Sequence, residues 1–335
     1  MSTLVLSQVE IRRLLPMEKC VQLMAEALKT LGRGDAVNPL RNGIRLPNDL
    51  GILGMMPGFM AEPQVLGLKV VAVFPGNHGT KYDSHQGVVV LFDTTHGLPV
   101  AILDASEITA IRTAAATAVA TQLLAREDAS DLAIVGSGVQ ARTHLEAMCV
   151  VRNITRVRVY SPHAEHRERF AREQGERHDV EVTATESAKA AVENADIICT
   201  TTTATEPVVH GDWIAPGCHI NAVGSSVRYA RELDTAAVVR SRLFVDRKES
   251  TINEAGDFLF PKKEGAVDDD HIVGEIGDIL LGKIGGRRTP DEITLFESLG
   301  LAVEDLAASY YVYHRALKEG SGTPVDLGGL AHAAT

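Results

Sequence analysis

The sequence predicts an α/β protein, with a doubly wound parallel sheet in its larger part and a smaller α+β domain before it. Three observations favour this fold: a glycine-rich turn between a strand and a helix, strands that alternate with helices after that turn, and about 130 residues of different pattern ahead of it. The chain has 335 residues, of which 45% are hydrophobic and 23% charged, so it is long enough for two buried cores.

The glycine-rich turn lies in residues 132–144, which read LAIVGSGVQARTH. A short apolar run is cut by Gly-Ser-Gly and continues as a helical pattern. Glycine lets the backbone turn sharply and approach a pyrophosphate, while the N-terminus of a helix attracts phosphates. Ala141 replaces the third glycine of the usual fingerprint, so the alternative is a glycine turn without a ligand. The turn favours a Rossmann-type dinucleotide site, and its predicted cofactor contacts are Gly136, Ser137, Gly138, Val139 and Gln140.

Alternating elements follow the turn. The pattern predicts strands over 156–160, 180–183, 196–201, 219–224 and 242–246, with helices over 145–151, 165–174 and 188–195. Loops and short helices are expected up to residue 292, then a long helix over 300–318 and a loose tail.

The N-terminal region has a different pattern. We expect one helix over 9–34, strands over 51–56, 67–74, 86–92 and 98–104, and an alanine-rich helix over 106–124. The last two of these strands are separated by five residues that end in Gly97, which predicts a hairpin.

The net charge of −11 disfavours nucleic acid and anionic membranes as partners, because the chain has no basic stripe. No leader or membrane-spanning run is apparent, and the four scattered cysteines predict free thiols, so we expect a cytoplasmic protein. The acidic run at 268–270 is interpreted as a solvated face, and no metal site is predicted.

Two cations in apolar surroundings are candidate site residues. Lys69 lies in GLKVVAVF, where burial without an anion is costly; it is either a ligand or proton donor for a substrate carboxylate, or a charge that protects an edge strand. Arg112 lies in the alanine-rich helix and either binds an anion or faces solvent. Arg41 and Arg45 are equally ambiguous.

The end of the second Rossmann strand bears on the cofactor. An acidic residue there would bind the ribose 2′-hydroxyl of NAD, but this chain reads Tyr160-Ser161-Pro162-His163, with Arg167 shortly after. Without that acid a 2′-phosphate meets no repulsion. We therefore favour NADP(H), with NAD(H) as the alternative, and include Ser161, His163 and Arg167 among the predicted cofactor contacts.

Several blocks together resemble the ornithine cyclodeaminase and mu-crystallin family. They are PLR at 39–41, GMMPGF at 54–59, GLKVVAVFPGN at 67–77, SHQGVVVLFD at 84–93, ITAIRTAAATAVAT at 108–121, VGSGVQA at 135–141, HINAVGSS at 219–226 and ITLFESLGLAVEDLA at 293–307. The resemblance covers nearly the whole chain. It implies a substrate-binding and dimerisation domain over 1–120, joined by the C-terminal helix 305–330, and a Rossmann domain over 121–304 that binds NAD or NADP.

Site residues carry over from that resemblance. Arg41, Lys69 and Arg112 match the set that binds the carboxylate and handles protons, with Thr113 beside the cofactor. His85 could line the pocket, although a structural histidine is an equal alternative. Three more residues complete the predicted cofactor contacts: Thr201, Val223 and Ser298.

Two departures from ornithine cyclodeaminases favour a different reaction. Those enzymes carry carboxylates at the positions of Gly54 and Ser226, and neither residue here offers one. The resemblance is thus closer to the ketimine reductase branch, with Ser226 at a catalytic position. Three hypotheses remain open. The first is a homodimeric reductase that converts an imino acid or cyclic ketimine carboxylate to an α-amino acid, or a related amino acid dehydrogenase. The others are a cyclodeaminase lyase with recycled NAD and an NADP(H)-binding protein with little turnover.

Overall fold

The computed structural model describes residues 2–77 and 79–329. The chain divides into two compact units, Met1–Arg112 with Leu301–Thr335, and Thr113–Gly300. The sequence-based boundaries were 120/121 and 304/305. The first of these falls inside the helix α3 (Ala105–Leu124), which begins in the first unit and continues into the second.

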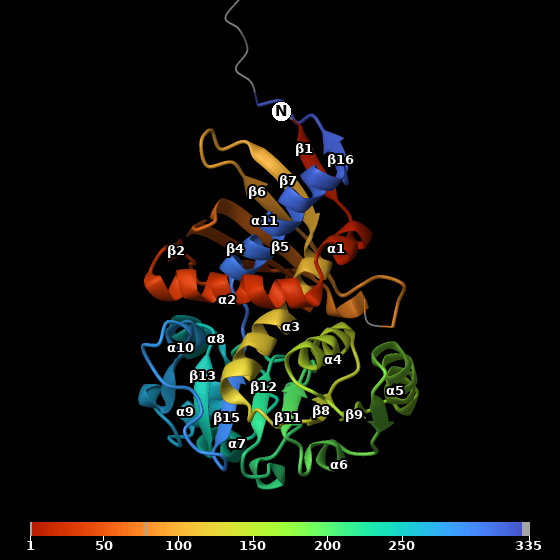
Figure 1. Ribbon diagram of the computed structural model, residues 1–335, viewed down its shortest axis with the longest axis vertical. Helices are drawn as coiled ribbons and strands as arrows, with labels where there is room; N and C mark the ends of the chain where they lie inside the picture. The colour runs from red at the N-terminus through yellow and green to blue at the C-terminus, as the bar shows by residue number, and fades with distance from the viewer. Residues whose placement is uncertain (1, 78, 330–335) are drawn as a thin grey trace, which may run out of the picture. The chain divides into compact units, whose positions relative to one another are not determined.

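The second unit is built on one parallel sheet, as the sequence predicts (Figure 1). All of its strand pairs are parallel. In spatial order the strands are β10 (Glu181–Ala184), β9 (Arg156–Tyr160), β8 (Asp131–Val135), β11 (Ile197–Thr200), β12 (His219–Ala222), β15 (Ile293–Glu297), β13 (Ser241–Val245) and β14 (Ile272–Glu275). Strand order reverses between β8 and β11, so ligands are expected at the carboxyl ends of these two strands.

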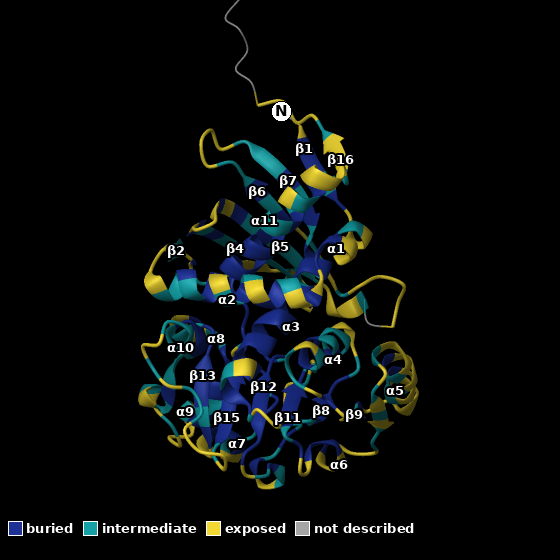
Figure 2. Cartoon of the chain, in the orientation of Figure 1, coloured by how far each residue is buried: buried dark blue, intermediate teal, exposed yellow. Residues whose placement is uncertain are grey.

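The central strands are buried on both faces, as Figure 2 shows in dark blue. This double burial explains why they appear in the sequence as apolar runs. The helices of this unit are α4 (Val139–Val151), α5 (Ala164–His178), α6 (Ala188–Val192), α7 (Thr235–Val239), α8 (Lys248–Glu254), α9 (Gly256–Lys263) and α10 (Ile276–Leu280), with short 3-10 turns at Gly211–Trp213 and Asp269–His271.

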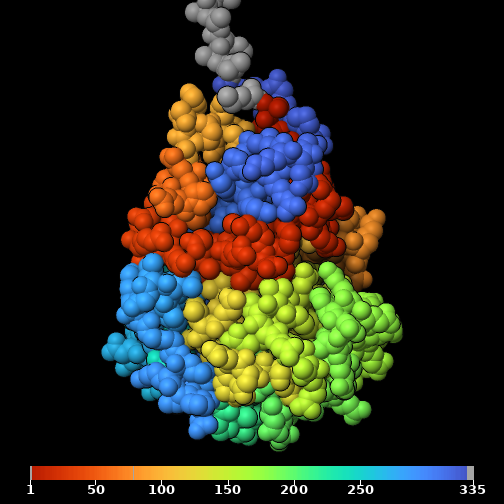
Figure 3. Space-filling view, viewed as in Figure 1, coloured from red at the N-terminus to blue at the C-terminus, as the bar shows by residue number. Residues whose placement is uncertain are grey.

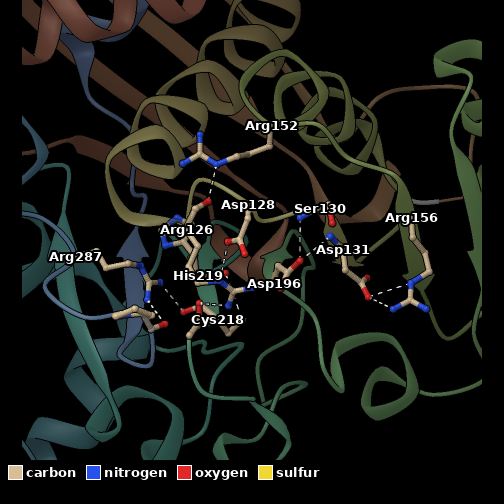
Figure 4. Close-up of polar contacts among 12 residues, drawn as sticks. Arg126, Asp128, Ser130, Asp131, Arg152, Arg156, Asp196, Cys218, His219 and Arg287 are labelled. Carbon is tan, nitrogen blue, oxygen red and sulfur yellow. Dashed lines mark hydrogen bonds and ion pairs between the residues drawn. The ribbon is translucent and has the colours of Figure 1, made fainter.

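Polar contacts join the amino ends of the strands, on the edge opposite the expected ligand (Figure 4). Arg126 Nη2 donates to Asp196 Oδ1 at 2.5 Å, and Asp196 Oδ2 accepts the N–H of Asp131 at 3.0 Å. Arg287 Nη2 donates to the carbonyl of Cys218 at 3.3 Å. These contacts tie the starts of β8, β11 and β12 together, so they stabilise the sheet without occupying its carboxyl edge.

The first unit contains a second sheet of eight strands. Its order is β16 (Thr323–Val325), β1 (Thr3–Leu6), β7 (Pro99–Asp104), β6 (His85–Phe92), β5 (Gln64–Val73), β4 (Ile52–Ala61) and β2 (Ala36–Val37), with β3 (Asn42–Arg45) also paired to β4. The predicted hairpin is confirmed as β6 and β7, which pair antiparallel. The strand β16 lies in the tail that was expected to be loose, where it pairs with β1. Short 3-10 turns lie at Pro47–Asp49 and Pro75–Asn77.

The helices of this unit correct two expectations. The single helix expected over 9–34 is two helices, α1 (Gln8–Leu14) and α2 (Met17–Arg33), because Pro16 lies at the start of α2 and cannot continue a helix. The C-terminal helix α11 runs over Ala302–Glu319, which agrees with the long helix expected over 300–318. It does not extend to residue 330, because Gly320 ends it with φ of 65°.

Helix α11 packs on one face of the sheet and against α2, and Figure 3 shows the side chains of these two helices side by side. The close approach depends on glycine. A Cβ on Gly67 of β5 would lie 2.5 Å from Leu306 Cδ2, and one on Gly58 of β4 would lie 3.0 Å from Ala302 Cβ. The start of α11 therefore rests directly on the centre of the sheet.

None of the helices in the described part of the chain combines the length and apolar composition that a membrane crossing requires.

Candidate active site

Lys69 lies in a central strand of the first unit. Its strand β5 pairs with β4 on one side and β6 on the other, and its side chain is only 4% exposed. This position excludes the interpretation as an edge-strand charge. Nζ lies 2.7 Å from Asp305 Oδ2 and donates to Thr109 Oγ1 at 3.4 Å. Lys69 is therefore a buried ammonium held by a buried carboxylate.

Arg112 joins the same group of charges. Its Nε donates to Asp305 Oδ1 and its Nη1 to Glu304 Oε2, both at 2.8 Å. The side chain is 4% exposed, so it is not the solvent-facing arginine that was the alternative from the sequence. Asp305 consequently contacts both cations, one with each oxygen.

The first turn of α11 positions the two carboxylates. Glu304 Oε2 accepts the N–H of Leu301 at 3.3 Å, and Asn38 Oδ1 accepts the N–H of Val303 at 3.1 Å. These contacts satisfy N–H groups that a helix start leaves without helical partners. Sequence reasoning missed Glu304 and Asp305 because acidic residues on a helix usually face solvent. The missed indication was their position among apolar residues on every side of the first turn.

The electrostatics of this group follow from its burial. Burial lowers the pKa of Lys69 to about 8; Asp305 opposes this shift, and the charges of Arg112 and Arg41 add to it. Burial alone would raise the pKa of Asp305, but Arg112 and Lys69 hold it below its ordinary range. Asp305 thus contacts both Lys69 and Arg112, and Glu304 contacts Arg112, within one buried group of charges.

The other predicted substrate residues are less enclosed. Arg41 is half-buried just before β3, and His85 is exposed at the start of β6, where its Nδ1 lies 3.0 Å from Ser84 Oγ. Ser226 is half-buried in the second unit, in the segment after β12.

The glycine turn has the shape that a dinucleotide requires. Gly136 has φ of 120°, and a Cβ there would lie 2.5 Å from Thr201 Oγ1. Gly138 begins α4 without a side-chain cap, and a Cβ there would meet nothing within 4 Å. Uncapped N–H groups beside open space, at the start of a 13-residue helix, fit the binding of an anion. Ser137, Val139 and Gln140 continue the turn into α4.

The other predicted cofactor residues of the second unit lie mostly at strand ends. The N–H groups of Thr201, Val223 and Ser298 donate to Val135, Thr200 and Ala222 at 2.8, 3.1 and 2.9 Å. These bonds align the ends of β8, β11, β12 and β15. The buried atoms Ser298 Oγ and Gln140 Oε1 have no hydrogen-bond partner among the described residues, which fits contact with a polar ligand. Thr113 is buried on α3.

The segment after β9 carries the residues that bear on a 2′-phosphate. Ser161 is buried, and its carbonyl accepts from Arg167 Nη1 at 3.2 Å. His163 is exposed at the start of α5. Arg167 is thus placed beside this segment, where no carboxylate follows Tyr160 directly.

The chain is similar to several known proteins along most of its length. It is 38% identical to ketimine reductase mu-crystallin of Mus musculus over 281 residues, 84% of this chain and 85% of that one. A solved Delta(1)-pyrroline-2-carboxylate reductase of Thermococcus litoralis, in complex with NADH and L-proline, is 41% identical with a TM-score of 0.95 and covers 96% of this chain and 100% of its own. An archaeal alanine dehydrogenase dimer with bound NAD is 30% identical with a TM-score of 0.92, over 98% and 100%.

A family model also matches residues 1–320, and its description is the ornithine cyclodeaminase/mu-crystallin family. The match confirms the resemblance that the sequence blocks indicate. This chain belongs to the ornithine cyclodeaminase/mu-crystallin family.

Proposed function

We propose that this chain is an NAD(P)H-dependent reductase that converts an imino acid or cyclic ketimine carboxylate to an α-amino acid. The observation that carries the proposal is the buried group of Lys69, Arg112, Glu304 and Asp305, in which one carboxylate holds an ammonium and a guanidinium together, the two cations that suit a substrate carboxylate. The named activities of the mouse and Thermococcus relatives support the same reaction.

The first unit would hold the substrate through its own residues. Arg41, Lys69 and Arg112 would bind and orient the carboxylate beside the C=N bond. Lys69, with its lowered pKa, would carry a proton that can pass to the imine nitrogen near neutral pH. His85 would line the outer part of the substrate region.

The second unit would hold the cofactor. The turn at Gly136–Gly138 and the uncapped start of α4 fit a pyrophosphate, and the unpartnered Ser298 Oγ and Gln140 Oε1 fit polar groups of the ligand. A bound reduced nicotinamide dinucleotide supplies the hydride for the imine carbon. We favour NADP(H), with NAD(H) as the alternative, because Arg167 rather than a carboxylate lies beside the segment after β9. The solved relatives named above contain NADH or NAD.

Ser226 separates the reductase from a lyase. A cyclodeaminase needs a carboxylate at this position to handle the amino group, and a hydroxyl cannot replace it as a base. The absence of a carboxylate at both Gly54 and Ser226 favours reduction over ring closure of ornithine.

Assays of cofactor oxidation test this proposal. Wild type should oxidise NADPH, and NADH less efficiently in kcat/KM, with the cyclic ketimines of proline and pipecolate or with pyruvate plus ammonia or methylamine. It should release no proline from ornithine, and Ser226→Asp should not improve reduction, because the added carboxylate would repel the substrate.

Three outcomes of these assays would contradict parts of the proposal. Conversion of ornithine to proline and ammonia without net change in cofactor absorbance would establish the lyase. Tight cofactor binding without turnover on any of these imines would favour a binding protein. A clear preference for NADH would overturn only the choice of NADP(H).

We also propose that the first unit pairs with a second copy of this chain through its sheet. On the face opposite α11, apolar side chains of β4, β5 and β6 lie next to one another in register. All of them are half-buried or exposed. They are Pro57, Phe59, Leu66, Leu68, Val90 and Phe92. A continuous apolar patch of this kind is typical of an interface, and the archaeal relative is described as a dimer.

Val90→Arg should convert the homodimer to a monomer, because a charge within the patch would be buried on pairing. Light scattering at micromolar concentration gives the mass. Val150→Arg, at an exposed valine of α4, is the matched control and should leave the dimer intact. A wild-type monomer, or a Val90→Arg dimer, would contradict the proposed interface.

A further inference from the structure

Asp305 connects the two cations of the candidate active site. Its Oδ2 lies 2.7 Å from Lys69 Nζ and its Oδ1 accepts from Arg112 Nε at 2.8 Å. The three side chains come from α11, β5 and α3, and the Asp305 side chain has no exposed surface. One carboxylate thus fixes the spacing between an ammonium and a guanidinium that belong to different elements.

We propose that Asp305 is a positioning residue for the reduction: it holds Lys69 Nζ and the Arg112 guanidinium at one spacing, so that both engage the same substrate carboxylate. This inference rests on the proposed function. Asp305 acts through Lys69 and Arg112, because both of its oxygens already face these cations.

The neighbouring acid has a different role. Glu304 Oε2 accepts from Arg112 Nη1 and from the N–H of Leu301, so it holds one cation and the start of α11. Lys69 is paired with Asp305 and is not paired with Glu304. The two adjacent carboxylates therefore make a natural comparison, since only Asp305 contacts both cations.

Asp305 also favours the charged form of Lys69. The charged groups that act on Lys69 are Asp305 from α11, Arg112 from α3 and Arg41 before β3. Burial and the two arginines lower the pKa of Lys69, and Asp305 alone among these groups raises it. Loss of the Asp305 charge should therefore lower that pKa further, below about 8, so that Lys69 loses its proton at a lower pH.

The pH dependence of kcat/KM tests the inference with Asp305→Asn, which keeps the shape and removes the charge. In wild type, kcat/KM should fall as the pH rises through the pKa of Lys69. In Asp305→Asn this fall should begin at least one pH unit lower. The ratio of its kcat/KM to that of wild type should then be about tenfold smaller at pH 9 than at pH 6. Glu304→Gln is the matched control, and its fall should stay at the wild-type pH.

Inhibition by pyrrole-2-carboxylate provides a second measurement, because this carboxylate has no imine nitrogen that titrates. In Asp305→Asn, the inhibition constant should begin to rise at a lower pH than in wild type, by the same shift as the fall of kcat/KM. An unchanged pH for both quantities in Asp305→Asn would overturn the inference.

Asp305→Asn alone could reduce kcat/KM simply because the variant folds poorly. A double-mutant cycle with Lys69→Met separates that effect from the proposed role. If Asp305 acts through Lys69, then Asp305→Asn should cost much less kcat/KM in the Lys69→Met background than in wild type. Equal costs in both backgrounds would mean a purely structural role. The double variant removes one charge of each sign, so it avoids leaving the buried ammonium unpaired.

Failure of the proposed function can be distinguished from failure of the positioning role of Asp305. If wild type turns over none of the imines, the proposed function fails, and the pKa of Lys69 Nζ measured by NMR in the two variants still tests the electrostatic part. If wild type turns over an imine and the alkaline fall does not move in Asp305→Asn, only the positioning role fails.

Discussion

Arg112→Ala is expected to lower the free energy of unfolding by about 3–5 kcal/mol, because it removes a buried guanidinium that donates to two buried carboxylates. Glu304 and Asp305 are at most 1% exposed, and the guanidinium donates to both. Lys69 would still compensate Asp305, whereas Glu304 would lose its ion pair with Arg112. Urea unfolding followed by circular dichroism measures the loss. Arg13→Ala is the control: Arg13 pairs with Glu319 at 2.6 Å but is 54% exposed, so its removal should cost far less.

The same substitution should reduce turnover, as should Lys69→Ala. Each removes a charged hydrogen-bond partner of the substrate, so kcat/KM should fall by the equivalent of about 2–4 kcal/mol. Cofactor affinity, measured by fluorescence titration of NADPH, should survive Lys69→Ala because Lys69 belongs to the substrate-binding unit. If either variant kept the wild-type kcat/KM, the substituted residue would not belong to the substrate site. This holds even if Arg112→Ala lowered the stability.

Most of the Rossmann sheet could be predicted from the sequence because its strands are short, apolar and separated by helical patterns. The strand β9 was predicted with its observed limits, and β8 was recognised from its apolar run before the glycine turn. The strand β15 was not predicted. It follows a long charged segment, and its place between β12 and β13 depends on crossover connections that no local pattern records.

The candidate site was predicted in part. Lys69 and Arg112 attract attention because a charge in apolar surroundings is costly, and the structure shows both buried. Their acidic partners did not attract attention, since Asp305 lies 193 positions from Arg112 in the sequence. Such a contact depends on α11 returning to the first sheet, where Gly67 allows the close approach. The pairing of buried charges is thus a tertiary property, whereas the glycine turn is local and could be predicted from its residues.

Substitution of two glycines of that turn distinguishes what the fold requires from what cofactor binding requires. Gly136 has φ of 120°, and a Cβ there would lie 2.5 Å from Thr201 Oγ1 and 2.8 Å from the Thr201 carbonyl oxygen. Gly136→Ala should therefore strain the carboxyl ends of β8 and β11. We expect a loss of about 1–3 kcal/mol in the free energy of unfolding without cofactor, together with loss of cofactor binding.

Gly138→Ala is the matched substitution two residues later. Gly138 has φ of −83°, which alanine adopts readily, and a Cβ would meet no atom within 4 Å, so stability without cofactor should be close to wild type. The added methyl group would occupy space that a pyrophosphate needs to approach the N–H groups of α4, so NADPH affinity should fall at least about tenfold. Thermal unfolding with and without NADPH measures both effects. If Gly138→Ala retained wild-type affinity, the pyrophosphate would have to bind elsewhere, because a ligand at this turn cannot avoid the added methyl group.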